Sequence, residues 1–418
     1  MSGSASRASR YARMVINKDG KTASIVGKTT SFDFYESVYS PEVTATIVFV
    51  DAGESIGASK DQDTQERTGS IKNSLPITGM EDFEVNIQSK SGTLIYVKNP
   101  LKVNSAPIVS QESNRQIVLL SLKSNPAIDN KDIKNACKKY KGRISNTVES
   151  ILKEMNIKKY TIDGTKNAFD FISKGEGGLD LINYLCKKSI PEKGDPGFFF
   201  YETQDGLNFR AIDNLIAEES VATYTYSGAL KDQEDNDFKI VLPPNIIKDQ
   251  DVSKALESGT YSSRNVFFNP LTFETEEKIY KLNEDNPETT LGKEVPFKDK
   301  VKNYSKTNYH ILDIGSLDPT NTAPNNDSRE WQAKSSMRYN LLHSQIMSIQ
   351  VPCNLQLRAG NIITVEIERQ GDKALGGVDQ QQSGKYMILH LCHHFDSLRS
   401  FTSMTLARDS YGLYTGKK

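Results

Sequence analysis

Apolar and polar residues alternate along several stretches of the chain, and the clearest stretch lies near its C-terminus. Residues 345–351 alternate, and residues 355–357 extend the pattern beyond Pro352. A period of two predicts a half-buried β-strand, because successive side chains of a strand point to opposite faces of its sheet. A glycine-containing turn at 359–361 leads into a second apolar run at 362–367. We therefore expect these two runs to form a β-hairpin.

A second strand pair follows in the same C-terminal part. Residues 386–395 and 401–408 are β-like and flank a short turn at 396–400. Four strands in succession predict a small β-barrel. The N-terminal part of the chain gives the same signal, interrupted by a long polar loop at 51–73. Its β-like runs are residues 31–35, 43–50, 83–87, 94–97 and 116–122.

Helical signals replace the strand signals after Asn125. The Ser-Asn-Thr cluster at 145–147 predicts the N-terminal cap of a helix that extends through Met155. Gly178 precedes a second amphipathic run, LDLINYLCKK. These helices predict a module separate from the strands on either side.

The chain returns to strand-like sequence at Gly197. The segment FFFYETQDGLNF, residues 198–209, contains two β-like runs joined through Asp205 and Gly206, a strong hairpin signal. From 233 to 329 the sequence is polar and irregular and predicts an insertion, with short strand candidates at 238–242 and 265–268. We therefore expect the 198–209 hairpin to belong to the C-terminal barrel.

Composition narrows the classes of protein that fit. The 418 residues include 52 Lys and Arg against 53 Asp and Glu, which argues against a protein that coats nucleic acid. The four cysteines are scattered without paired spacing, as expected of reduced thiols in a protein made inside the cell. The serine-rich, basic N-terminus lacks the apolar core of a signal peptide, and no apolar run is long enough to span a membrane. Residues 1–12 fit a disordered arm, which we favour, or a segment that orders on a partner.

One strand carries the densest group of residues that can bind metal. The group is His390, Cys392, His393 and His394, and His390, Cys392 and His394 are spaced by two, so these three share one face of the predicted strand. The same pattern fits a strand whose histidines are packed or solvated. We favour that interpretation, because no second ligand pair has zinc spacing. The sequence therefore predicts no metal site, with these three residues as the only candidate ligands.

The sequence signals for catalysis and for phosphate binding are weaker than the signal for a metal site. No GxSxG motif occurs, and His310 and His343 stand alone, as structural histidines do. The carboxylate pairs 81–82 and 202/205 are the kind that glycoside hydrolysis needs, but acidic pairs are common. The glycines at 175, 177 and 178 are not followed by a Walker lysine, so they fit the start of a helix better than a phosphate-binding loop. The basic run KKYKGR at 138–143 fits a solvent-exposed face. We expect no catalytic residue and no cofactor.

Several strings in order resemble the baseplate hub proteins of contractile-tailed, T-even-type phages, which are related to the hub portion of type VI secretion spike proteins. LPITGMEDFEVNI is similar to the strand entry of that family's first barrel, and QIVLLSLKS followed by KKYKGRISNTVESILKE resembles its passage into a helical domain. FDFISKGEGGLDLINYLCKKS followed by GFFFYETQDGLNF resembles its helix and aromatic hairpin. RYNLLHSQIMSIQVPCNLQLRAGNIITVEI and GKYMILHLCHHFDSLRSFTSMTLARDSYG resemble its second barrel.

The resemblance implies a mainly β fold with α+β insertions. Two tube-like antiparallel β-barrel domains would be joined by a helical and mixed peripheral domain. The implied divisions are a flexible arm (1–12), the first barrel (13–124), the helical part of the peripheral domain (125–196), the first part of the second barrel (197–232), the inserted part of the peripheral domain (233–329) and the remainder of the second barrel (330–418).

The resemblance also implies a structural function. Three copies would form a ring of pseudo-sixfold symmetry that joins a threefold central spike to the sixfold tail tube in the virion. The implied partners are the other two copies, the spike, a tube or tube-initiator protein and the baseplate wedge proteins, with genomic DNA passing through the ring without sequence-specific binding. Assembly would take place in the host cytoplasm, and the piercing spike would be another chain.

Two alternatives stay open at this point. The first is the hub of a secretion system or a related contractile injection particle, which differs in cargo rather than in fold. The second belongs to another class, a polysaccharide-binding or polysaccharide-hydrolysing β protein that would use the aromatics at 198–201 and the acids beside them. Those aromatics fit a buried hairpin face better.

Overall fold

Most of the regular structure is β-strand, as the mainly β fold class predicted. The computed structural model describes residues 6–52, 71, 75–112, 115–131, 137–227, 237–282, 290–293, 295, 301–314, 317, 324–369 and 377–412. The N-terminal strands are β1 (Arg10–Lys18), β2 (Lys21–Ser24), β3 (Thr29–Ser37), β4 (Thr44–Asp51), β5 (Asp82–Ser89), β6 (Gly92–Ser105), β7 (Ile108–Gln111) and β8 (Gln116–Lys123), with a 3-10 turn, η1 (Val26–Lys28), before β3.

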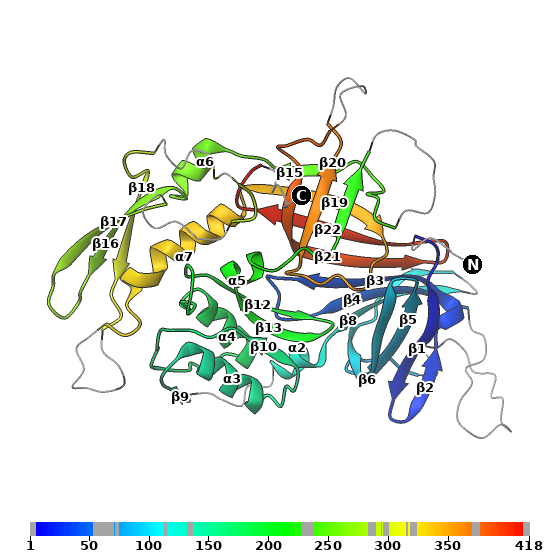
Figure 1. Ribbon diagram of the computed structural model, residues 1–418. Coiled ribbons are helices and arrows are strands. Elements are labelled where there is room, and N and C mark those ends of the chain that lie inside the picture. The colour runs from blue at the N-terminus through cyan, green and yellow to red at the C-terminus, as the bar shows by residue number, and fades with distance from the viewer. Residues whose placement is uncertain are drawn as a thin grey trace.

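Six strands from the C-terminal part join the same sheet. They are β14 (Thr223–Tyr226), β15 (Asn245–Lys248), β19 (Gln345–Pro352), β20 (Ile362–Ile367), β21 (Gly384–Asp396) and β22 (Ser400–Arg408). The 14-stranded sheet runs β15-β19-β22-β21-β3-β4-β8-β6-β5-β1-β2, with β20 and β14 continuing beside β21 and β7 beside β8. Strand β3 pairs with β21, so the two parts of the chain share one hydrogen-bonded array (Figure 1). Within the described residues, no pairing closes the array between β15 and β2.

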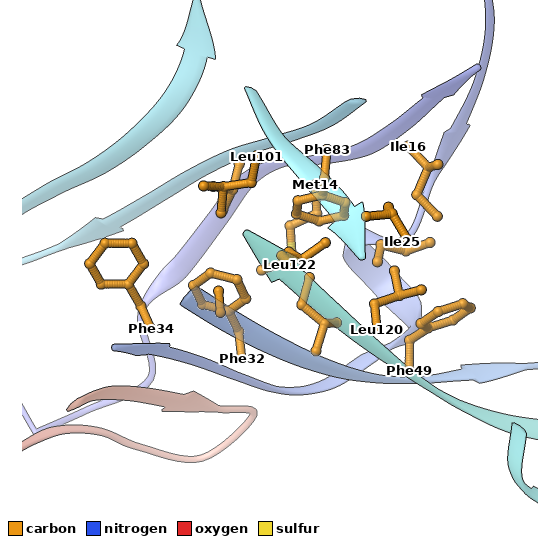
Figure 2. Packing of buried hydrophobic residues seen from close by; sticks show 14 of the residues in the cluster. Met14, Ile16, Ile25, Phe32, Phe34, Phe49, Phe83, Leu101, Leu120 and Leu122 are labelled. Carbon is orange, nitrogen blue, oxygen red and sulfur yellow. The ribbon is translucent and has the colours of Figure 1, made fainter. Parts of the chain in front are cut away.

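Two hydrophobic cores pack on this sheet. In β4 every second residue is buried, and the buried set includes Ala45, Ile47 and Phe49. Figure 2 shows side chains from several N-terminal strands, among them Phe32 and Leu120, gathered in one interior. The C-terminal strands bury a second cluster of their own. The strands predicted at 31–35, 43–50, 83–87, 94–97 and 116–122 are all present, whereas most of the predicted 51–73 loop lies outside the described residues.

The predicted hairpin of β19 and β20 is wrong, although both strands form. β19 pairs with β15 and β22, and β20 pairs with β14 and β21. The residues between them cross from one core to the other, because Leu355 is buried with the N-terminal strands and Leu357 with the C-terminal ones. Residues 355–357 consequently form a buried connection rather than a strand extension. The predicted pair of β21 and β22 is confirmed.

A helical module follows β8. Its elements are α2 (Asn125–Asp129), β9 (Lys139–Tyr140), α3 (Ile144–Glu154), β10 (Tyr160–Ile162), β11 (Phe171–Ile172), α4 (Gly178–Cys186), β12 (Phe198–Thr203), β13 (Gly206–Ala211) and α5 (Ile212–Ile216). The predicted N-terminal cap of α3 is wrong. The helix begins at Ile144, its N-cap residue is Arg143, and the side chain of Arg143 makes no capping hydrogen bond. The N–H of Ser145 instead donates to Thr165 Oγ1 at 2.9 Å, so a distant hydroxyl satisfies the helix start.

The β12–β13 hairpin forms as predicted but does not pair with the C-terminal strands. It makes a separate three-stranded sheet with β10. All six residues of β12 are buried, since Phe198 and Phe200 pack in the core of the helical module and Phe199 and Tyr201 pack against β21 and α5. The hairpin therefore lies between the module and the large sheet, where both of its faces are covered.

The stretch predicted as an irregular insertion contains its own small sheet. Its elements are α6 (Val252–Glu257), β16 (Ser262–Phe268), β17 (Thr275–Lys281) and β18 (Lys306–Ile311), and α7 (Ser328–Leu342) packs against them with a core of Phe267, Tyr280 and Met337. The strand predicted at 265–268 lies within β16. The one predicted at 238–242 is not a strand, since it makes only a single bridge, Thr225↔Lys239.

The N-terminal residues that the structure describes pack against the rest of the chain. Residues 6–9 are held by the β21–β22 turn, where Ser400 N donates to Ser6 O at 3.0 Å. The predicted flexible arm is therefore wrong from residue 6 onward, and residues 1–5 lie outside the described part of the chain. Among the described helices, none combines the length and the apolar character that crossing a bilayer requires.

Candidate assembly surfaces and buried joints

The three candidate metal ligands lie on one face of β21, as predicted, but they have different partners. His394 Nδ1 lies 2.5 Å from Asp33 Oδ1, and Cys392 Sγ lies 3.9 Å from the same oxygen. Burial raises the pKa of the Cys392 thiol to about 12, and Asp33 adds to the rise, so the thiolate is disfavoured. His390 contacts the ring of Tyr39, with centroids 5.4 Å apart. Among the described residues, no group of three or more His, Cys, Asp or Glu side chains is placed to hold a metal ion.

The two lone histidines also make structural contacts. His310 Nε2 lies 2.8 Å from Asn265 Oδ1, and its ring stacks on Phe267. His343 Nδ1 lies 2.7 Å from Tyr339 O. Burial lowers the pKa of both histidines, which keeps the imidazoles neutral. The Nε2 of His343 also hydrogen-bonds to the hydroxyl of Tyr39, and burial raises the pKa of that hydroxyl to about 12, which keeps it neutral.

The carboxylate pairs do not converge on an open site. Glu81 accepts the N–H groups of Thr78 at 2.7 Å and Gly79 at 2.9 Å, which places it in a loop. Glu202 is buried, whereas the side chain of Asp205 is 72% exposed and pairs with Arg358 at 2.7 Å. An acid and a base that flank one substrate bond must both reach it, which a buried Glu202 and a solvent-facing Asp205 do not.

The glycines and the basic run have packing explanations. A Cβ on Gly177 would meet Asn130 Oδ1 at 2.3 Å, and that oxygen accepts the N–H of Leu179 at 2.8 Å. Glycine is thus required by the close approach of α2 to the start of α4. In the basic run, Lys138 pairs with Glu154 and lies over the ring of Tyr140.

Two buried carboxyl groups join the β12–β13 hairpin to the large sheet. Glu36 accepts the N–H of Gln204 at 2.7 Å and that of Ala359 at 3.0 Å. Glu202 accepts the N–H of Val43 at 2.9 Å. Burial raises the pKa of each carboxyl to about 7, against the hydrogen bonds that favour the charged form. Each carboxyl therefore sits near its midpoint at neutral pH.

A buried ion network forms a second joint. Arg338 of α7 donates from Nε to Asp213 of α5 at 2.6 Å and from Nη1 to Asp409 at 3.0 Å. Asp409 also accepts the N–H of Leu291 at 2.9 Å. The three charged side chains are 1%, 6% and 0% exposed. This network fixes α7, the helical module and the chain after β22 to one another, and its members gave no signal in the sequence because they lie far apart along it.

The free edges of the large sheet differ in character. β15 pairs only with β19 among the described strands and exposes Ile246 and Ile247, 38% and 55%. β7 pairs only with β8 and exposes Ile108 and Val109, 38% and 64%. The β2 edge instead carries an exposed lysine, Lys21, which is how soluble proteins discourage edge pairing. The β15 and β7 edges are therefore the candidate surfaces for another chain.

Solved structures share this arrangement of strands and helices. A tail protein from Neisseria meningitidis MC58 aligns over 95% of this chain and 96% of its own with a TM-score of 0.56 and 11% identity. The 43 kDa tail protein of prophage MuSo2 from Shewanella oneidensis aligns over 95% of this chain and 98% of its own with a TM-score of 0.52 and 9% identity. The chain has the fold of phage tail proteins.

This tail-protein fold agrees with the mainly β fold class that the resemblance to baseplate hub proteins predicted. A lower-scoring match is the Escherichia coli c3393 protein, described as a component of the type VI secretion system, with a TM-score of 0.46 and 13% identity over 95% of this chain and 76% of its own. No protein-family model matches the chain. No curated protein sequence matches it either.

Proposed function

We propose that this chain is the structural hub of a contractile phage-tail baseplate, and that three copies form a pseudo-sixfold ring. The tail-protein fold supports this proposal. The observation that carries it is the division of one 14-stranded sheet into two sets of strands, each with its own hydrophobic core. Three copies with two such sets each supply six comparable units, which suits an adaptor between a threefold spike and a sixfold tube.

The ring would lie in the tail baseplate of the virion. Its inner face would line the channel for DNA, and its partners would be the spike, the tube and the wedge proteins. The barrel and peripheral domain boundaries given by the sequence remain predictions within this proposal. A structural rather than enzymatic role is supported by the candidate acids and histidines, which are occupied in hydrogen bonds and ring contacts.

The apolar edges suggest how neighbouring copies meet. Strand β15 belongs to the C-terminal set and β7 to the N-terminal set, so pairing β15 of one copy with β7 of the next is a head-to-tail contact. Head-to-tail contacts generate closed rings when the rotation closes. Such pairing would cover Ile247 and Val109, which are more than half exposed in the single chain, and would satisfy the free backbone groups of both strands.

Light scattering of the purified protein tests the ring. We expect three times the mass of one chain, either alone or after addition of the spike protein encoded beside it. A charge placed in the contact, Ile247→Lys or Val109→Lys, is expected to shift the mass to that of the monomer. The matched control is Ile95→Lys, since Ile95 is 51% exposed but lies on β6, which is not part of the proposed contact. A monomer that ignores the spike would overturn the hub proposal, and a trimer unaffected by both edge variants would overturn only the β15–β7 contact.

A further inference from the structure

An open cleft separates the helical module from the small peripheral sheet. Its volume is about 740 Å³, large enough for several residues of an extended peptide. Its lining comes from α4 and β12 of the helical module, from β16 and β18 of the small sheet, and from α7. None of its described lining residues belongs to β15 or β7, the strands of the proposed ring contact.

The charged side chains that line the cleft are all positive. Its lining includes Lys187, Lys188 and Lys306, and none of its described lining residues is an aspartate or a glutamate. Lys187 and Lys306 are exposed. The carboxylate that interacts with Lys188 is Asp313, which stands outside the lining. A cleft walled by low-dielectric protein and lined by cations attracts an anionic ligand.

Aromatic rings give the cleft a second chemical character. Lys188 Nζ lies over three rings, 4.7 Å from the centroid of Phe169 and 5.1 Å from those of Tyr184 and Trp331. These contacts hold the ammonium group beside the cleft. Tyr184 remains 53% exposed, so part of its ring is free to receive an apolar or aromatic group.

A fixed polar network covers the opposite wall. Asn265 is fully buried, and its Nδ2 donates to Ser263 Oγ at 2.9 Å. Its Oδ1 accepts from Asn308 Nδ2 at 3.2 Å and lies 2.8 Å from His310 Nε2. The network holds the side chains of Asn308 and His310 in place on the cleft wall. Preorganised side-chain amides can hydrogen-bond to the main chain of a bound peptide without a large ordering cost.

We propose that this cleft binds an acidic segment of a partner protein that also carries aromatic residues. The lysines would contact its carboxylates, Tyr184 its aromatic side chains, and the β16–β18 network its main chain. A neutral ligand would leave the lysines unmatched, which is why a peptide of this composition is favoured over a saccharide. The inference goes beyond the proposed hub function, and it holds for a single chain as well as for a ring.

Trp331 makes the test direct. It is the only tryptophan in the sequence and it lines the cleft, so its fluorescence reports occupancy. The probe is a short synthetic peptide of glutamate and phenylalanine, compared with the same peptide carrying lysine for glutamate and with a chito-oligosaccharide. We expect saturable quenching or a shift of the Trp331 emission with the acidic peptide alone, weakening as salt is raised.

One double variant and a control assign the binding to the cleft. Lys187→Glu combined with Lys306→Glu is expected to weaken binding of the acidic peptide by about tenfold or more. Lys21→Glu makes the same charge reversal at a single exposed lysine of β2, half of the change in net charge, and is expected to leave binding within about twofold. Circular dichroism of each variant checks that it is folded.

Each remaining outcome overturns the proposal. Unchanged Trp331 emission means that the cleft does not bind the acidic peptide, and equal weakening by Lys21→Glu means that binding depends only on net charge. Binding of the lysine peptide or the saccharide in its place would assign the cleft to another ligand. None of these results alters the mass expected for the ring, so failure here is distinguishable from failure of the hub proposal.

Discussion

The interior of the large sheet and the joints around it are both fully buried, but they are built from opposite chemistry. The sheet interior is filled by side chains such as Phe49 and Leu120, whose burial is favourable in many arrangements. The joints hold Glu36, Glu202 and the Arg338 network, whose burial is favourable only when each group meets its partner. The comparison teaches that apolar burial stabilises this fold, whereas directional buried pairs set how the helical module and α7 sit on the sheet.

The largest effect is expected at the Arg338 joint. Arg338→Ala leaves the carboxylates of Asp213 and Asp409 buried without their cation, and we expect it to lower the free energy of unfolding by about 3–5 kcal/mol. Denaturant unfolding measures the change. Arg338→Met combined with Asp213→Asn and Asp409→Asn removes all three charges and is expected to recover part of the loss. If that triple variant is no more stable than Arg338→Ala, lost packing rather than unpaired charge sets the cost.

The sheet interior is tested within a single strand. Leu120→Ala on β8 opens a cavity in the N-terminal core and is expected to cost about 3 kcal/mol. Leu119→Ala is the matched control, because Leu119 lies on the opposite, partly exposed face of the same strand. We expect it to cost about 1 kcal/mol or less. Equal losses for the two variants would contradict the one-sided burial of β8.

The third test uses pH, because the joints contain titratable carboxyl groups and the apolar interior of the sheet does not. The pKa of Glu36 and Glu202 is raised from 4.5 to about 7, so the folded protein binds protons that the unfolded chain has released between these values. Their contribution to stability is therefore present at low pH and is lost as pH rises through 7. We expect it to change by roughly 2–3 kcal/mol for each carboxyl, about 5 kcal/mol for the two together, between pH 5 and pH 8. Core variants should not alter this dependence.

The control for this pH dependence is the double variant Glu36→Gln, Glu202→Gln. Buried histidines act in the opposite sense, since burial lowers the pKa of His393 to about 3 and its neutral form stabilises the protein above pH 6.5. The difference between the parent protein and the double variant removes that effect. A difference that does not vary with pH would show that these carboxyls keep one charge state throughout.

The smallest effect on stability is expected at Glu81, whose pKa is lowered rather than raised. Burial acts to raise its pKa, but the N–H groups of Thr78 and Gly79 and the ammonium group of Lys18 together lower it. Its contribution is therefore present above pH 4.5 and lost as pH falls through the lowered pKa. Glu81→Gln should cost about 1–2 kcal/mol at pH 7 and less in acid. A loss that grows in acid would contradict this sign.

The strands were predictable because one face of each is buried and the other is not. Alternate positions of β3, β4, β5 and β8 are buried, so each strand carries its own signal in eight or nine residues. The pairing of β19 and β20 was not predictable in this way. It depends on Leu355 and Leu357 entering different cores, which no local pattern records.

The candidate sites show the same division. Alternation placed His390, Cys392 and His394 on one face correctly, but it could not show that Asp33 lies beside two of them, since β3 is more than three hundred residues away. The position of the β12–β13 hairpin did leave a signal. Its run FFFY is apolar without alternation, which indicates a strand covered on both faces rather than an outer barrel strand.

The pairing of β3 with β21 also limits how early the large sheet can be completed during synthesis. Cys392 lies against Asp33 across 359 residues of chain, so the sheet cannot be completed until almost the whole protein has been synthesised. At ordinary translation rates the side of β3 that receives β21 stays unpaired for roughly 20–70 s after it is made. During that interval β3 is open to the wrong strand, from this chain or from a neighbouring ribosome. The strand pair that unites the finished molecule is therefore also the one that must wait longest for its partner.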